Sequence, residues 1–247
     1  MKRIAFVDWG VGGLGVVERC LRAQPDLSFV YVSDTGAVPY GKQSARQLSD
    51  RLVTIAERLS ATYGITNLAI ACNAASTVAP RVSVRVPRLR VHDIITHGVN
   101  SVLAARVKHV GIVAGARTVR SGAYRSLLNA RDVRVSQRIA QPLSAHIEAG
   151  RQGSEIFLRD VQNIVRPLKK CDALLLACTH YPAARDVFAK VLPGMLILDP
   201  AARFSAHLLE FSLATQGEQI YVTSGDPRAM AQSAKLAWNA KLHAQRW

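Results

Sequence analysis

The sequence feature that most constrains the fold is an internal repeat of short apolar segments. Residues 3–10 (RIAFVDWG) resemble residues 109–116 (HVGIVAGA), and residues 68–73 (LAIACN) resemble residues 174–179 (LLLACT). In both pairs the second segment lies 106 positions after the first (109 against 3, and 174 against 68), and the second pair carries a cysteine at the same place. Two matches with one shared offset indicate a chain built from two similar halves.

Short apolar runs alternate with longer segments of helical periodicity along the chain. The expected strands are residues 3–7, 28–32, 67–71, 89–91, 109–113, 172–177, 195–198 and 219–222. The expected helices include residues 45–63, 156–168, 183–191 and 200–215. Such alternation is typical of parallel sheets that helices cover on both faces.

We therefore predict an α/β fold with two similar open α/β domains that are related by pseudo-symmetry and have a ligand cleft between them. Residues 1–95 form the first domain and residues 96–199 the second, while the tail, residues 200–247, packs back on the first.

Three polar side chains stand where expected strands end. Asp8, Cys72 and Cys178 each follow an apolar strand and precede a turn or a helix start. In open α/β sheets, ligands bind beyond the carboxyl ends of the strands. Two halves that face one another would therefore bring both cysteines to one ligand from opposite sides. At Cys72 we also expect the positive end of the following helix to lower the thiol pKa, although free cysteines are often inert core residues. His180 follows Cys178 closely and could hold a thiolate or relay a proton.

The composition is that of an ordinary globular protein. The 247 residues are 49% hydrophobic and 20% charged, which excludes disordered and fibrous chains. No uninterrupted apolar run approaches the roughly 20 residues that cross a bilayer. The first apolar run ends at Asp8, too early for a signal peptide. We therefore expect a cytoplasmic protein that makes no contact with a membrane.

The net charge of +15 leaves the partner open. A basic background, an anionic small substrate or contact with nucleic acid would each explain it. Aromatic residues make up only 6% of the chain, and no nucleic-acid module is visible, so few stacking platforms exist for bases. An arginine run before His92 is interpreted as an exposed face, with binding of an anion or a protein as the alternative. It consists of Arg81, Arg85, Arg88 and Arg90.

The cysteines and histidines show no metal-ligand pattern. None of the 4 cysteines forms a CxxC pair, and the 7 histidines lack an HExxH or similar spacing. Without an export signal, the cysteines are expected to be free thiols. We therefore expect no metal and no other cofactor, pyridoxal phosphate included.

Two thiols on opposite faces of one carbon suit stereoinversion. One thiolate, from Cys72 or Cys178, removes the proton from Cα, and the other thiol delivers a proton to the opposite face. Because an amino-acid Cα proton is a very weak acid, fixed N–H donors and a desolvated site must stabilise the developing carbanion.

Five motifs, in order along the chain, carry a family resemblance. They are residues 8–14 (DWGVGGL), 34–41 (DTGAVPYG), 72–76 (CNAAS), 118–124 (TVRSGAY) and 178–182 (CTHYP). They resemble the D-S-G-V-G-G-L, D-T-x-x-x-P-Y-G, C-N-T-A-S, T-V-x-S-x-x-Y and C-T-H-Y-P motifs of glutamate racemase, in the aspartate/glutamate racemase superfamily. The resemblance implies cofactor-independent racemisation of an acidic amino acid, L- and D-glutamate foremost, which supplies D-glutamate for peptidoglycan.

The resemblance also implies a role for each matching residue. Cys72 and Cys178 would be the acid/base pair, Asp8 and His180 would assist their respective thiols, and Glu148 would be an auxiliary carboxylate. The substrate-binding positions would be Trp9, Tyr40, Gly41, Asn73, Ala74 and Thr179. Two alternatives stay open, since Glu148 could be an exposed helix carboxylate and Tyr40 a packing aromatic. The partners implied are an amino-acid substrate and a second copy of the chain in a homodimer, and contact with DNA gyrase or nucleic acid stays open.

Several positions depart from the family pattern inside the motifs. Trp9 stands where the family has serine, and Ala74 where it has threonine. Gly115 and Arg117 replace Thr and Gly in the family's A-T-x-G-T-V stretch, and the segment before Glu148 is one residue shorter. We hypothesise that the Trp9 indole projects into the cleft and narrows it; the alternative is a ring that turns outward to pack on a neighbouring helix. Two functional alternatives follow: a weak or inactive homologue with a binding or regulatory role, or a two-cysteine racemase for another substrate such as aspartate or a hydantoin.

Overall fold

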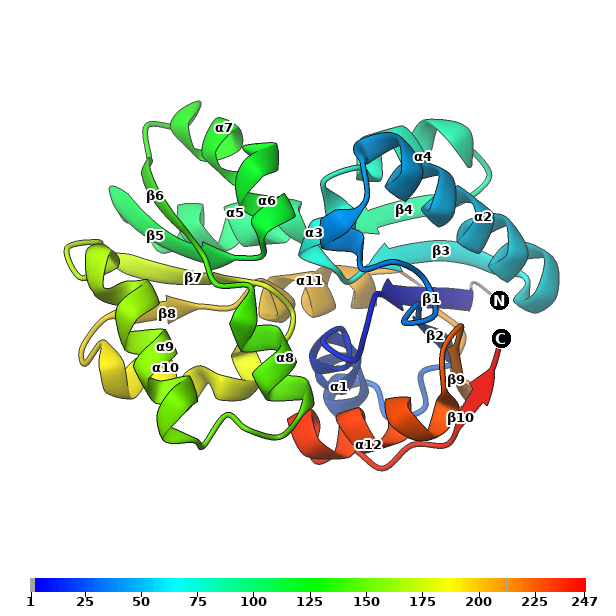
Figure 1. Ribbon diagram of the computed structural model, residues 1–247. Helices are drawn as coiled ribbons and strands as arrows, with labels where there is room; N and C mark the ends of the chain where they lie inside the picture. Colours follow the sequence, from blue (N-terminus) through cyan, green and yellow to red (C-terminus); the bar gives the residue numbers. More distant parts are fainter. Residues whose placement is uncertain (1–2, 212) are drawn as a thin grey trace.

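Two parallel β-sheets form the framework of the chain, as Figure 1 shows for this computed structural model, which describes residues 3–211 and 213–247. The first sheet has the strand order β10-β9-β2-β1-β3-β4 and the second β6-β5-β7-β8. The first sheet comprises β1 (Arg3–Asp8), β2 (Phe29–Ser33), β3 (Ile65–Ile70), β4 (Arg90–Asp93), β9 (Gln219–Thr223) and β10 (Ala244–Arg246). The second comprises β5 (His109–Ala114), β6 (Arg134–Ile139), β7 (Ala173–Ala177) and β8 (Leu196–Leu198).

Helices connect and cover these strands. Those of the first part of the chain are α1 (Leu14–Ala23), α2 (Ala45–Tyr63), α3 (Asn73–Ser76), α4 (Ala79–Arg85) and α5 (Ile94–Ala104). Next come α6 (Ala116–Ser121), α7 (Ala123–Asn129), α8 (Pro142–Glu148), α9 (Glu155–Val165), α10 (Arg185–Val191), α11 (Pro200–Leu209) and α12 (Pro227–Trp238). Three short 3₁₀ turns are η1 (Tyr40–Lys42), η2 (Arg166–Leu168) and η3 (Tyr181–Ala184). Within the described ranges, no helix combines the length and the apolar character that crossing a bilayer requires.

The two sheets share one topology, which confirms the predicted α/β fold of two similar open domains. The order β2-β1-β3-β4 in the first sheet has the same pattern as β6-β5-β7-β8 in the second. The repeated segments of the sequence are β1 with β5 and β3 with β7, the two middle strands of this shared four-strand order. The first sheet is larger, because β9 pairs with β2, and β10 pairs with β9.

The central strands are buried on both faces, which explains their almost unbroken apolar sequences. Along β1, Ile4 and Phe6 pack into one core cluster while Ala5 and Val7 pack into another. This is the two-residue alternation of a β-strand whose faces are both covered by helices. The polar residue Asp8 stands at the last position of the strand, where the apolar sequence ends.

The chain crosses between the sheets at two capped helix starts. The Asp93 side chain accepts a hydrogen bond from the Thr96 N–H at the start of α5 (3.0 Å), and the Asp199 side chain accepts one from the Ala201 N–H at the start of α11 (2.9 Å). Helices α5 and α11 pack against each other, and Figure 1 shows α11 between the two sheets. The two crossings hold the carboxyl ends of both sheets toward a common region.

Three expectations about single elements were wrong. β6 was not expected, because its sequence RVSQRI is half-polar and lies at an edge with little burial. β10 was also not expected, since it is an edge strand of three residues. The helix expected over residues 200–215 ends at Leu209; residue 212, inside that range, lies outside the described residues.

Candidate functional site

All predicted site residues line one cavity of about 380 Å³. It opens where β1, β3 and β7 end, between the two sheets. The predicted residues in its wall are Asp8, Trp9, Tyr40, Gly41, Cys72, Asn73, Ala74, Glu148, Cys178, Thr179 and His180. The sequence therefore identified positions that come from distant parts of the chain and meet in space.

Cys72 begins α3 on the side of the first sheet and is 8% exposed. Burial is the largest cause that raises the pKa of its thiol, and the Asp8 carboxylate raises it further. The Ala75 backbone N–H acts in the opposite direction but does not outweigh them. The expected lowering of this pKa was therefore wrong. The helix after the thiol spans only four residues, too short to offset burial next to a carboxylate.

The Asp8 carboxylate is held by three hydrogen bonds. Its Oδ1 accepts from the Trp9 N–H (2.7 Å), while its Oδ2 accepts from the Gly13 N–H (2.7 Å) and from the Thr179 hydroxyl (2.9 Å). Asp8 is 1% exposed, so these donors take the place of water. Because Thr179 follows Cys178 on the other sheet, Asp8 also joins the two thiol-bearing loops.

Cys178 faces a histidine that is paired with a carboxylate. Its Sγ lies 3.8 Å from Nδ1 of His180, and Nε2 of His180 lies 2.7 Å from Oε1 of Glu148. Burial by itself lowers the pKa of His180, but the hydrogen bonds to Cys178 and Glu148 raise it, and the net shift is upward. Burial similarly raises the pKa of Glu148, whereas its hydrogen bond to His180 lowers it, with a net downward shift. The favoured state of His180 is therefore an imidazolium that is paired with the Glu148 carboxylate and faces the Cys178 sulfur.

A glycine loop allows these groups to approach the end of β1. A Cβ atom on Gly12 would lie 2.5 Å from the Thr179 Oγ1 and 2.6 Å from the His180 Nδ1. One on Gly10 would collide with the Glu148 carboxylate, which also accepts a hydrogen bond from the Val11 N–H (3.3 Å). Gly10 and Gly12 are thus required by the close packing of the second half on this loop.

Asn73 and Tyr40 differ in whether their polar groups are free for a ligand. The Asn73 Oδ1 accepts a hydrogen bond from the Tyr124 hydroxyl (2.7 Å). Its Nδ2 is buried and has no hydrogen-bond partner within the described ranges. The Tyr40 hydroxyl instead donates to Oδ2 of Asp34 (2.9 Å), so only its ring and backbone are available to the cavity. The Asn73 amide N–H is therefore a donor without a partner among the described residues, whereas the Tyr40 hydroxyl is already paired.

Trp9 both lines the cavity and packs against the first half. Its Nε1 donates to the Ala37 carbonyl (3.0 Å), and its ring packs on the core cluster around β1 and α2. Ala74 lines the same wall. Both positions where the family has a hydroxyl therefore contribute apolar surface here.

The structure adds cavity residues that the sequence did not single out as site residues. Arg117 on α6 donates from Nε to the Thr77 hydroxyl (3.0 Å) and from Nη1 to the Gln43 carbonyl (2.6 Å). Gln141 lines the wall as well, and its Oε1 accepts from the Ala116 N–H (3.1 Å). The available signal was that Arg117 interrupts a motif in which the family has glycine.

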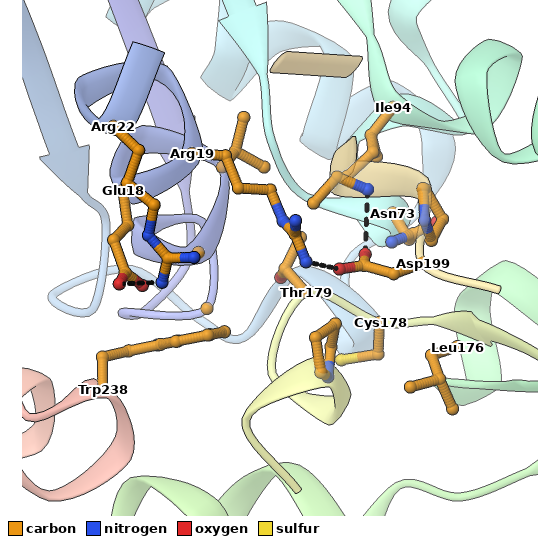
Figure 2. Close-up of a pocket in the computed structure, with 16 residues that line it drawn as sticks. Glu18, Arg19, Arg22, Asn73, Ile94, Leu176, Cys178, Thr179, Asp199 and Trp238 are labelled. Carbon is orange, nitrogen blue, oxygen red and sulfur yellow. Dashed lines mark hydrogen bonds and ion pairs between the residues drawn. The ribbon is translucent and has the colours of Figure 1, made fainter. Parts of the chain in front are cut away.

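A smaller cavity of about 170 Å³ lies behind Cys178, on the side of α1 and α11. Figure 2 shows its charged side chains already paired: Arg19 with Asp199 (2.9 Å), and Arg22 with Glu18 (2.5 Å). The flat ring of Trp238 closes one side of it. Cys72 is not among its lining residues, so this space cannot place a ligand between the two thiols.

The described residues contain no group of three or more His, Cys, Asp or Glu side chains arranged for a metal ion. All four cysteines are free thiols.

Known proteins resemble this chain in both sequence and structure. The Asp/Glu/Hydantoin racemase family model matches residues 15–204. The glutamate racemase of Ectopseudomonas mendocina is 34% identical over 240 residues, which cover 92% of this chain and 91% of that protein. The glutamate racemase isoform RacE1 of Bacillus anthracis superposes with a TM-score of 0.90 at 22% identity, covering 100% of this chain and 97% of that one. The Francisella tularensis glutamate racemase, solved with D-glutamate, gives a TM-score of 0.89 at 23% identity and covers the same shares.

Proposed function

Because the chain belongs to the Asp/Glu/Hydantoin racemase family, we propose that it interconverts the L and D forms of glutamate with Cys72 and Cys178 as its two acid/base groups. The observation that carries the proposal is that two free thiols, from equivalent positions of the two halves, line one cavity. The identity of 34% to a glutamate racemase, over nearly the whole of both chains, favours this enzyme over a homologue with only a regulatory role.

In the proposed reaction one thiolate removes the Cα proton and the other thiol returns a proton to the opposite face. The electron pair left on carbon delocalises into the α-carboxylate, and the site must stabilise that charge as it develops. No atom is gained or lost, because each turnover leaves the first sulfur protonated and the second ionised. Proton exchange with solvent, or the reverse reaction, restores the initial state before the next turnover.

The surroundings of the two sulfurs support a different resting state for each. His180, paired with Glu148, places a positive charge beside the Cys178 sulfur, and we propose that this sulfur begins as the base. Burial and Asp8 raise the pKa of Cys72 and favour its neutral thiol. One sulfur is then ready to accept a proton and the other to donate one, which is the state that a two-base racemisation needs at its start.

The wider assignment rests on the same proposal. The product D-glutamate would supply peptidoglycan synthesis from the cytoplasm. We propose that residues 1–95 with 200–247 form one domain and residues 96–199 the other, so that each domain carries one of the two thiols that line the cavity. We also propose that the protein acts as a homodimer. The finding that Gln219–Thr223 extends the first sheet supports this division.

The test is deuterium uptake at Cα in D₂O, measured by NMR over a panel of amino acids with the wild-type protein and the Cys72→Ala and Cys178→Ala variants. We expect uptake and inversion of glutamate by the wild type. Each variant should lose racemisation by about 1,000-fold or more, because each thiol is the acid in one direction and the base in the other. Both should still fold, since losing one buried sulfur atom costs only about 1–2 kcal/mol. Uptake with no amino acid, or normal racemisation by either variant, would contradict the proposal.

A further inference from the structure

Arg117 places a positive charge in the wall of the thiol cavity at a position where the family motif has glycine. It lies on α6, next to the carboxyl end of β5, and is partly buried. The resemblance therefore assigns it no role.

The guanidinium is fixed by groups of the first half. Thr77 accepts from Nε at 3.0 Å and the Gln43 carbonyl accepts from Nη1 at 2.6 Å. Both acceptors are neutral, and within the described part of the chain no carboxylate forms an ion pair with Arg117. The Nη2 group makes no hydrogen bond to a described residue. A charge that is oriented but not neutralised is suited to receive an anion.

The same cavity has lost hydroxyl donors that the family pattern supplies. Trp9, Ala74 and Gly115 each stand where the motifs have serine or threonine, and all three line the wall. The Thr179 hydroxyl is committed to Asp8. A dicarboxylate that enters here therefore meets fewer neutral donors and one additional cation.

Asn73 is the second donor without a partner in the described part of the chain, and its position next to Cys72 indicates a different role from that of Arg117. It follows Cys72 directly, and its Nδ2 is buried with no partner in the described residues. Asn73 lines the thiol cavity beside Cys72, so we assign its amide to the carboxylate attached to the reacting carbon. Arg117 comes from α6, after β5, and its guanidinium donates to Thr77 and Gln43 rather than to either sulfur, so we assign it to a carboxylate farther along the substrate.

We propose that Arg117 binds the side-chain carboxylate of the substrate and thereby selects acidic over neutral amino acids. The inference rests on the proposed racemase function and goes beyond it by naming the group that sets specificity. It concerns the carboxylate shared by aspartate and glutamate, and the length of the side chain is decided by the assay.

The kinetic test compares glutamate, aspartate and glutamine with the wild type and with Arg117→Ala, Arg117→Lys and Arg117→Gly. In Arg117→Ala we expect kcat/KM for the preferred acidic substrate to fall by about 10- to 100-fold, the loss typical of a hydrogen bond to a charged group. Turnover of glutamine should change by less than about 3-fold, and Arg117→Lys should recover part of the loss. Arg81→Ala is the matched control, because it removes an exposed positive charge that influences Arg117 but does not line the cavity.

A binding test separates this inference from the proposed function. Calorimetry with glutarate and butyrate measures the value of a second carboxylate without any reaction. We expect the wild type to prefer glutarate by about 10-fold or more and Arg117→Ala to lose that preference. Equal binding of glutarate by both proteins, or an equal kinetic loss on glutamate and glutamine, would overturn the inference. A wild type that racemises nothing but shows the Arg117-dependent preference would overturn only the proposed function.

Discussion

The two halves of the molecule share a strand order but surround their thiols differently. Cys72, after β3, is buried beside a carboxylate. Cys178, after β7, faces an imidazole that is paired with a carboxylate. A repeated fold thus supplies two sulfurs at equivalent positions, while side chains that are not repeated give each sulfur different charged neighbours.

Three contacts between the halves orient functional groups of the site. Asp8 accepts from Thr179, Asn73 accepts from Tyr124, and the Gly10–Gly13 loop receives Glu148 and His180. In each case a functional group of one half is oriented by the other half. A change in how the domains pack is therefore expected to alter catalysis before it alters either core.

The largest effect in these comparisons is expected from His180→Asn. Removing the imidazolium should lower kcat/KM for glutamate by about 100-fold, because the proton transfer at Cys178 loses the cation beside its sulfur. The loss must be the same for both enantiomers, since their equilibrium constant is one.

Glu148→Gln should lower kcat/KM for glutamate by about 10-fold. It should also shift the alkaline limb of the pH–rate profile to lower pH, because Glu148 helps to raise the pKa of His180.

The stability lost in His180→Asn has a predictable pH dependence. The pKa of His180 is higher in the folded state than in the unfolded state. Its charged form therefore stabilises the fold fully below about pH 6.5, and that contribution disappears as pH rises through the folded value. Urea denaturation should show wild type and His180→Asn differing most at low pH and converging at high pH. A difference that grows with pH would contradict the assignment of an imidazolium.

The sequence predicted those features of the fold and the site that follow from the internal repeat and from the positions of the strand ends. The offset of 106 residues identified the equivalent central strands, and the strand-end rule gathered Asp8, Cys72 and Cys178. It did not predict β6, whose polar edge position carries no apolar signal. Nor did it give the direction of the Cys72 pKa shift, because burial and a neighbouring carboxylate depend on tertiary packing. The hydrogen bonds from Arg117 to Gln43 and Thr77 join residues of the two halves, so no short stretch of the sequence predicts them.

A smaller effect is expected from Gly12→Ala, which tests how tightly the second half packs on the first. The added methyl would contact the Thr179 Oγ1 and the His180 Nδ1 at 2.5 and 2.6 Å, so those side chains must move. We expect a loss of about 1–3 kcal/mol in the free energy of unfolding and about a 10-fold lower kcat, from a misplaced catalytic group. Gly153→Ala is the control, since nothing lies within 4 Å of its added Cβ. Equal behaviour of the two variants would show that the halves can separate freely at this loop.

The smallest effect concerns Trp9, which contributes to the cavity wall and to the core of the first half at once. Its ring packs on that core and its Nε1 donates to the Ala37 carbonyl (3.0 Å), so the indole is anchored at the edge of the cleft. If it narrows the cleft, Trp9→Ser should raise kcat/KM for glutamate about 3-fold by opening space and adding a donor, and Ala74→Thr should add to this gain. The same variant should lower the Tm, because aromatic packing is lost. Trp9→Phe, which keeps most of the ring but not the hydrogen bond, separates volume from anchoring. A Trp9→Ser protein that is less stable and no more active would show that the ring supports the wall without obstructing the substrate, and that the first half tolerates an apolar wall where its relatives use a hydroxyl.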